Sequence, residues 1–188
     1  MVPAAAVLVD KIVAVVNAEV LTLLDFEDHL ALVQVFQAGA ADVTREQAFE
    51  RFIDQTLLRQ EALRTKIVEI EETDVAQQIH ALEQRPGGRD ALARVEQERG
   101  ISLSHVRIWL RHQLIVRGFI DRRVRLFVRV SDREVTHYYQ REQPAIGEPM
   151  SDAVREQIRR ILVEQRVNAR VAQLVEELRR KANLLFPP

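Results

Sequence analysis

The five histidines are the side chains in this sequence best suited to bind a metal ion or to move a proton near neutral pH. His105 and His112 are seven residues apart, which puts them two turns apart on nearly one face of a helix. No carboxylate stands at the short helical spacing from either one that metal ligation favours. The pattern therefore favours surface or capping histidines, and we expect no metal and no cofactor.

Other catalytic patterns are missing from the sequence. It contains no HExxH, no GxSxG and no phosphate-binding glycine loop. Without cysteine, it has no disulfides, no thiolate nucleophile and no Cys-based zinc site. Glu71 and Glu72 are adjacent carboxylates, but neighbouring helix residues point about 100° apart, so a helix start suits them better than paired catalysis. We expect no catalytic residue and no enzyme activity.

The charge balance excludes a general attraction to polyanions. Lys plus Arg number 27 against 28 for Asp plus Glu, giving a net charge of -1. The basic runs at 117–125 and 158–166 alternate with apolar or acidic residues, as solvated helix faces do. No apolar run approaches the roughly 20 residues of a membrane span. A hydrophobic fraction of 47% with 29% charged residues indicates a folded protein, and we expect neither a nucleic-acid partner nor membrane insertion.

A short β-ribbon is predicted at the front of the chain. The β-branched runs 11–16 and 19–22 flank Asn17 and Ala18 at the spacing of a two-residue hairpin. Such turns favour positive φ, which Asn tolerates and Ala does not, so the turn is either strained or built differently. Because an isolated hairpin is marginal in water, it must be covered by helices or extended by another strand.

Helical periodicity accounts for most of the remaining chain. The predicted helices start at the caps Asp25, Thr44, the acidic turn at Glu71, Asp90, Ser102, Ser131 and Ser151, with Gly39 and Gly100 as stops and a length of about 30 residues for the last one. Their predicted inner faces include Phe26, Leu30, Val33 and Phe36, then Leu63, and after Ser102 a wide face with Leu103. The breadth of that face indicates a central helix contacted from two sides.

Two further segments are strand candidates, and one segment is a break. Residues 125–130 alternate charged and apolar side chains, so they could pair with the opening ribbon, and 183–186 could end the chain as a strand. Residues 143–149 hold two prolines and a glycine, which predicts a linker.

The order of these elements resembles the N-terminal domain of the SurA-type periplasmic chaperones. The resemblance is carried by VVNAEVLTLLDFEDHL, AFERFIDQTLLRQEALRTK, GISLSHVRIWLRHQLIVRGFI and VSDREVTHYYQ, and it covers about residues 10 to 140. Asn17 and Thr22 match the family's hairpin, whereas Ala18 stands where glycine is usual. The family implies a mainly α fold with a small β-sheet and a long C-terminal helix packed on it.

The resemblance also implies a domain plan. Residues 1–9 form a flexible start, 10–142 the chaperone domain, 143–149 a linker, and 150–188 a C-terminal helix and tail that complete the same domain. In the family a parvulin-type prolyl isomerase domain normally lies at the position of this linker, and seven residues cannot form one. The chain would then be the chaperone module without the isomerase.

A holder of unfolded polypeptides needs an exposed apolar groove, because its clients offer apolar side chains and unpaired backbone. Large residues able to line such a groove are predicted here as peptide-binding candidates. Ordinary core positions are the alternative for each, and we favour the core for Trp109. The candidates are Val33, Phe36, Trp109, Phe119, Tyr138 and Tyr139.

The resemblance implies an ATP-independent chaperone that binds unfolded or outer-membrane-bound polypeptides in the bacterial periplasm. The start MVPAAAV has no signal-peptide pattern and could be a mature end behind a replaced signal. The alternative function is a dimerisation or scaffold module, possibly a homodimer swapped through the C-terminal helix.

Overall fold

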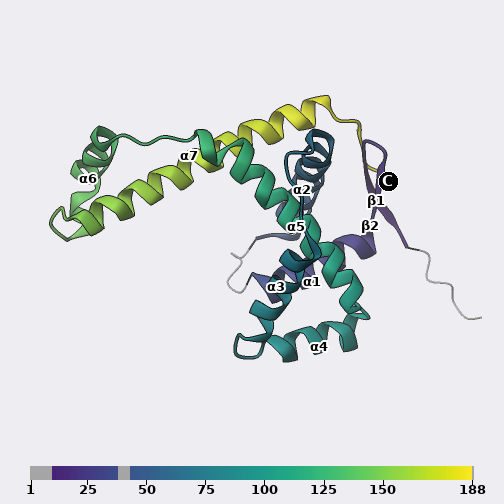
Figure 1. Cartoon of the computed structure of the whole chain (residues 1–188). Coiled ribbons are helices and arrows are strands. Elements are labelled where there is room, and N and C mark those ends of the chain that lie inside the picture. Colours follow the sequence, from purple (N-terminus) through teal and green to yellow (C-terminus); the bar gives the residue numbers. More distant parts are fainter. Residues whose placement is uncertain (1–9, 38–42, 188) are drawn as a thin grey trace, which may run out of the picture.

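The computed structural model describes residues 10–37 and 43–187 as a helical body with a small sheet at one side and a projecting arm at the other (Figure 1). The elements are β1 (Ile12–Val16), β2 (Glu19–Thr22), α1 (Leu23–Phe36), α2 (Arg45–Thr65), α3 (Glu72–Glu83), α4 (Gly88–Arg99), α5 (Leu103–Arg123), the 3-10 helix η1 (Arg125–Phe127), α6 (Asp132–Ile146), α7 (Asp152–Lys181) and β3 (Leu184–Leu185). The predicted mainly α fold with a small sheet is confirmed.

The sheet joins both ends of the chain. Its strand order is β2-β1-β3, with β1 antiparallel to both neighbours. The hairpin closes on the pair Val16 and Glu19, and Asn17 alone in the turn has a positive φ, of 60°. A turn that needs only one positive φ accepts Ala18 without strain, so the turn is built differently rather than strained.

One of the two further strand predictions is wrong. Residues 125–130 do not pair with the hairpin; Arg125–Phe127 form η1 directly after α5. The apolar residues that are buried there are Val124 and Val128, one helical turn apart, and they pack against Val167 of α7. The alternation of charged and apolar residues at 125–130 therefore reflects a tight turn that packs against α7, not a strand. The other segment does form the strand β3, paired through Leu184 and Leu185.

The end of α2, the hairpin turn and the C-terminal segment meet at a three-residue contact that we name the Asn17 clamp: Asn17, Gln60 and Asn183. The Asn17 N–H donates to the Asn183 carbonyl at 2.8 Å, and the Asn183 N–H donates to Asn17 Oδ1 at 3.0 Å. Asn17 Nδ2 donates to Gln60 Oε1 at 2.7 Å, and Gln60 Nε2 donates to the Val16 carbonyl at 3.1 Å. The hairpin is thus bound to α2 and to the chain end at once.

Helix α5 is the central helix of the body, as its broad apolar face predicts. On one side Val106 and Leu110 pack with α1 and α3, and on the other Ile115, Val116 and Phe119 pack with α2 and α7. The second half of α7 therefore lies along the body, which confirms that the long C-terminal helix packs on it.

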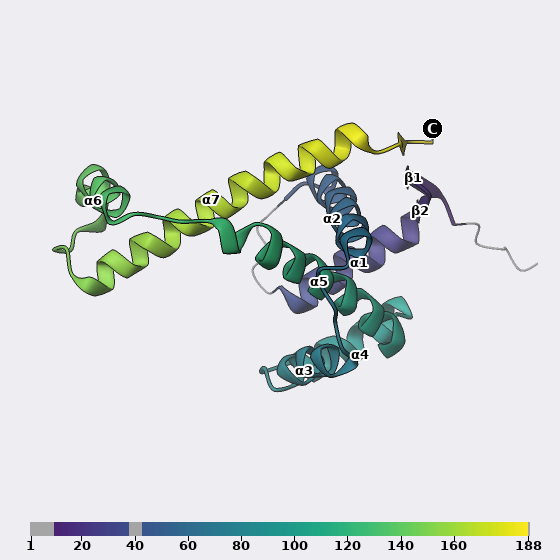
Figure 2. The same cartoon turned by 45° about the horizontal axis from the view of Figure 1, so that its top comes forward.

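The other half of α7 forms an arm with α6, residues 130–162, which projects away from the body in both views (Figures 1 and 2). Val135, Val154 and Ile158 form its separate small core. The predicted capping box of Ser131 and Glu134 starts α6, with Glu134 Oε2 accepting from the Ser131 N–H at 2.8 Å.

Several predicted helix boundaries and inner positions shift. The cap of α1 is Thr22, with Asp25 completing its capping box, and the cap of α4 is Gly87 rather than Asp90. Helix α6 continues to Ile146, so the residues that join α6 to α7 are 147–151 instead of the predicted 143–149.

Some residues predicted to face inward do not. Leu63 and Leu103 are about half exposed, at 52% and 47%. In α1 the buried side chains are Phe26, His29, Ala31 and Leu32, whereas the predicted Leu30, Val33 and Phe36 are half-buried.

Two expectations lie outside the described residues: the flexible start at 1–9 and the helix stop at Gly39. Of the helices in the described ranges, none is both long and apolar enough to cross a membrane.

We expect Asn17→Gly to lower the free energy of unfolding by about 1 to 2 kcal/mol, because glycine keeps the positive φ but removes two side-chain hydrogen bonds. Asn17→Asp keeps the side-chain oxygen that accepts from Asn183 and loses only the donor to Gln60. Its free energy of unfolding should therefore lie between those of the wild type and Asn17→Gly. Urea unfolding measures both. Equal stability of all three proteins would contradict the clamp.

Candidate binding groove

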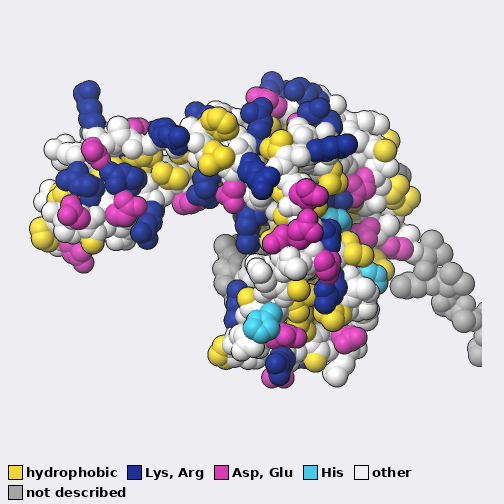
Figure 3. Space-filling model, viewed as in Figure 1, with side chains coloured by type: hydrophobic (Ala, Val, Ile, Leu, Met, Phe, Trp, Pro, Cys, Tyr) yellow, Lys and Arg dark blue, Asp and Glu magenta, His cyan; other side chains and the backbone are white. Residues whose placement is uncertain are grey.

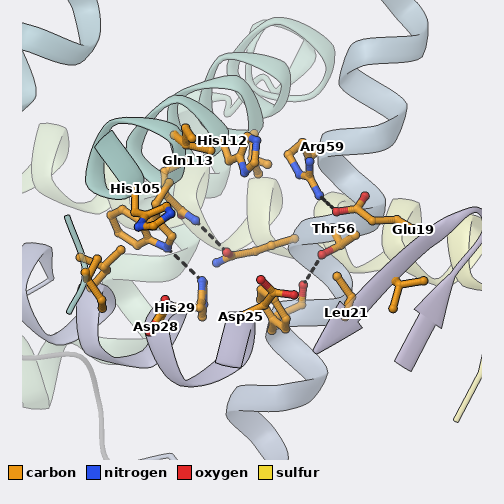
Figure 4. A pocket seen from close by; sticks show the side chains of 18 residues that line it. Glu19, Leu21, Asp25, Asp28, His29, Thr56, Arg59, His105, His112 and Gln113 are labelled. Atoms are coloured by element: carbon orange, nitrogen blue, oxygen red, sulfur yellow. Dashed lines mark hydrogen bonds and ion pairs between the residues drawn. The ribbon is translucent and has the colours of Figure 1, made fainter. Parts of the chain in front are cut away.

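A groove of about 320 Å³ opens where β2, α1, α2 and α5 meet, and it is the candidate functional site. Figure 4 shows the side chains of α1, including Asp25, Asp28 and His29, facing those of α5 across the hollow. Strand β2 forms one border with Val20, and α5 forms another with Ile108. These two rim residues are 48% and 54% exposed, so the groove carries apolar side chains at its mouth.

An unbroken series of aromatic rings supports the groove from below. The centroid distances are 5.2 Å for Phe49 and Phe26, 5.8 Å for Phe26 and Phe52, 4.8 Å for Phe52 and His29, 6.1 Å for His29 and Trp109, and 5.3 Å for Trp109 and Phe36. The rings alternate among α1, α2 and α5, and edge or tilted ring contacts of this kind stabilise packing beyond the area they bury. The three helices are therefore held at defined distances around the groove.

His29 and Trp109 meet at the floor of the groove. Trp109 Nε1 donates a hydrogen bond to His29 Nδ1 at 3.1 Å, so Nδ1 carries no proton and the ring is neutral with its proton on Nε2. His29 is 5% exposed, and burial lowers its pKa to about 4. The bond keeps the indole in one orientation beside the open space.

The opposite side of the groove is polar. Arg59 of α2 pairs with Glu19 of β2, whose second oxygen accepts from Gln60 Nε2 at 3.0 Å. His112 of α5 also lines the groove, and burial, reinforced by the charge of Arg59, lowers its pKa to about 4. Both imidazoles are therefore neutral near pH 7 and add no positive charge to the site.

Asp28 is the carboxylate of α1 that has no assigned partner. No hydrogen bond or ion pair within the described ranges involves its side chain. Burial raises the pKa of Asp28, with the charges of His105 and Arg99 acting in the opposite direction. Its carboxylate lines the groove without a cation held against it.

Comparison with protein-family models and with curated proteins found no match to this chain. The likeness to SurA-type chaperones remains an expectation drawn from the residues quoted above.

The structure brings two of the six predicted peptide-binding residues together. Phe36 and Trp109 are in ring contact, and Trp109 lines the groove, although a core position was the favoured interpretation for it. Val33, from the same helix as Phe36, is half-buried and does not line the groove.

The other three predicted residues lie elsewhere. Phe119 is 0% exposed in the core between α2, α5 and α7, so it presents no surface to a peptide. Tyr138 and Tyr139 belong to the core of the arm, where the Tyr139 hydroxyl donates to the Glu148 carbonyl at 2.9 Å. These two tyrosines, in the middle of α6, therefore build the arm and do not contribute to the groove.

Of the residues that line the groove, only Trp109 was predicted from the sequence as a binding residue. Among those not predicted are Val20, His29, Phe52 and Ile108. His29 could have been found, because it stands three residues after Phe26 and three before Leu32, on the stripe that α1 buries. Val20 and Ile108 carry no such signal, since an exposed apolar residue in a sequence looks the same as a buried one.

Charge and metal chemistry add little to this site. His105 and His112 both line the groove, yet no group of three or more His, Asp or Glu in the described part of the chain is arranged to hold a metal ion. On the face in Figure 3, dark blue basic and magenta acidic side chains both occur on the arm and on the body.

Phe119→Ala should cost about 3 to 5 kcal/mol of unfolding free energy, because it opens a cavity in a fully buried contact between three helices. Val33→Ala, on a half-buried residue, should cost clearly less. Chemical denaturation compares the two. A small loss for Phe119→Ala would show that this residue is not in the core.

Stability should fall as pH is lowered from about 6.5 towards 4. Because the folded pKa of His29 lies below its unfolded value, the unfolded chain takes up the proton first. His29 alone therefore accounts for a loss of up to about 3 kcal/mol of unfolding free energy by pH 4, and His112 adds a loss of the same sign. His29→Gln should be less stable at pH 7, and its deficit should shrink as pH falls. The exposed His137→Gln is the control and should follow wild type. A constant deficit of His29→Gln across this range would contradict a neutral buried His29.

Proposed function

We propose that this protein is an ATP-independent chaperone that binds unfolded polypeptide segments in the groove between β2 and α5, without prolyl isomerase activity. The observation that carries the proposal is the exposed apolar rim of Val20 and Ile108 above an aromatic floor. Unfolded chains present apolar side chains, and burying them against such a rim releases water from both surfaces.

The construction of the groove supports reversible holding. The aromatic series and the His29 to Trp109 hydrogen bond keep the floor in place before any client arrives, so binding does not have to order it. The hollow of about 320 Å³ accommodates one or two side chains rather than a folded domain. A client would therefore be held by a short segment and released by dilution or by a better partner, with no nucleotide needed.

The resemblance to the SurA-type chaperones supports a place in the bacterial periplasm and clients on their way to the outer membrane. In that family the isomerase domain stands between the counterparts of α6 and α7. Here residues 147–151 join these helices, and the two pack directly on each other through Val135 and Ile158. This continuity supports a chaperone module that holds clients without isomerising their prolines.

A second function, a dimerisation or scaffold module, is favoured by a different observation. Leu126 and Phe127 of η1 are 62% and 64% exposed where the arm leaves the body, and exposed neighbouring apolar residues often mark interfaces. Light scattering over a concentration series measures the oligomeric state. A dimer that Leu126→Ser with Phe127→Ser dissociates would support this function.

Sub-stoichiometric to equimolar protein should suppress the aggregation of a chemically unfolded client, followed by light scattering without ATP. Ile108→Ser should reduce this suppression several-fold, because it removes an apolar rim residue of the groove. Leu103→Ser is the matched control: it lies on the same helix with similar exposure, away from the groove, and should behave like wild type.

If wild-type protein leaves client aggregation unchanged, the chaperone function is wrong and the scaffold module remains as the proposed function. If Ile108→Ser and Leu103→Ser lose the same share of the aggregation suppression, the client binds outside the groove. Catalysed isomerisation of a proline peptide by the pure protein would contradict the proposed lack of isomerase activity.

A further inference from the structure

Strand β2 presents an open edge to the groove. In the two-residue hairpin, Val16 and Glu19 share hydrogen bonds, so the next pair, Val15 and Val20, turn their backbone groups outward. Val15 uses these groups to pair with Leu185 of β3. Within the described residues, no neighbouring strand pairs with Val20 on the other side of the sheet. Its N–H and carbonyl are therefore in position to bind another strand.

The open edge of β2 is limited at both ends by groups that already have partners. The next outward N–H along β2, that of Thr22, donates to Asp25 Oδ2 at 2.9 Å within the capping box of α1. At the other end, the Arg59 and Glu19 ion pair flanks Val20. A strand added here thus finds one free pair of backbone groups, those of Val20, and a short edge of this kind limits pairing with other chains.

The edge and the groove form one surface. Glu19, Val20 and Leu21 all line the same hollow as Trp109 and Ile108 of α5. Successive side chains of a strand point to opposite faces, so a segment lying beside β2 would direct alternate side chains into the hollow and towards solvent. Backbone pairing and apolar contact would then act on the same bound segment.

The charge of the groove indicates one further property of its occupant. Glu19 is paired with Arg59, and Asp25 is engaged with the N–H and hydroxyl of Thr22, but Asp28 has neither kind of partner among the described residues. A basic side chain on the bound segment would supply one. An acidic segment would instead meet like charge at Asp28.

We propose that the groove takes its client as an added β-strand on the edge of β2, and that it selects extended segments in which an apolar residue is followed or preceded by a basic one that pairs with Asp28. This inference rests on the proposed chaperone function and names its recognition mode and substrate class. Main-chain hydrogen bonds provide affinity for many sequences, while the hollow and Asp28 provide selection.

The first test separates backbone pairing from side-chain contact. The probes are fluorescent short peptides of alternating valine and threonine with one arginine near either end, read by anisotropy. Val20→Pro removes the outward N–H, a change that the free edge of a sheet tolerates, and should weaken binding about tenfold. Val20→Ile keeps the N–H and an apolar rim side chain, so it should lose far less binding than Val20→Pro. Because Val20→Pro could misfold, hydrogen exchange of the wild-type Val20 amide is measured too, and peptide should slow it.

The second test isolates the charge. Replacing the arginine of the peptide by citrulline keeps its shape and removes its charge. Asp28→Asn should weaken the arginine peptide roughly fivefold and leave the citrulline peptide unchanged. A glutamate peptide should bind wild type most weakly and gain from Asp28→Asn.

The outcomes distinguish the two proposals. If wild type suppresses client aggregation, but Val20→Pro binds peptide normally and the Val20 amide is not protected, strand addition is wrong and the chaperone function stands. If Asp28→Asn weakens both peptides equally, the selection for a basic residue is wrong. If wild type neither binds peptides nor suppresses aggregation, the chaperone function fails first.

Discussion

The joining of both chain ends in one sheet is the constraint on which the rest of the structure depends. Strand β1 lies between β2 and β3, and the Asn17 clamp connects the hairpin turn to α2 and to the segment after α7. With its end fixed, α7 lies along α2 and α5 and closes the core around Phe119. The same contact fixes the hairpin relative to α2, so the edge of β2 is held beside α5, which creates the groove.

The groove itself depends on a second, local constraint, the aromatic series through α1, α2 and α5. His29 is the polar member of that series, and its buried neutral ring accepts from Trp109 where another phenylalanine could not. The cost of burying an imidazole is offset by this hydrogen bond. The result is a floor held in place beneath an apolar rim, which is the feature on which the proposed binding of extended chains rests.

Sequence patterns predicted the fold where local signals dominate and failed where tertiary contacts decide. Caps and periodicity depend on residues that are close together in the sequence. For this reason the sequence predicted the hairpin, the capping boxes at Thr44 and Ser131, and the long helix from Ser151. The alternation at 125–130 misled, since a turn against α7 produces the same pattern as a strand. Large aromatic size alone could not separate the groove residue Trp109 from the core residue Phe119, because exposure depends on which helices cross there. Rim residues such as Ile108 could not be predicted as groove residues for the same reason.

The single tryptophan offers the most direct measurement of the central claim, that unfolded polypeptide binds in this groove. Trp109 is the one tryptophan of the chain and lies at the groove floor. Titration with an unfolded client that lacks tryptophan should produce a saturable change in Trp109 emission, at the same concentrations at which the client's own label reports binding. Client binding that leaves the emission unchanged would place the binding surface elsewhere on the molecule and contradict this account.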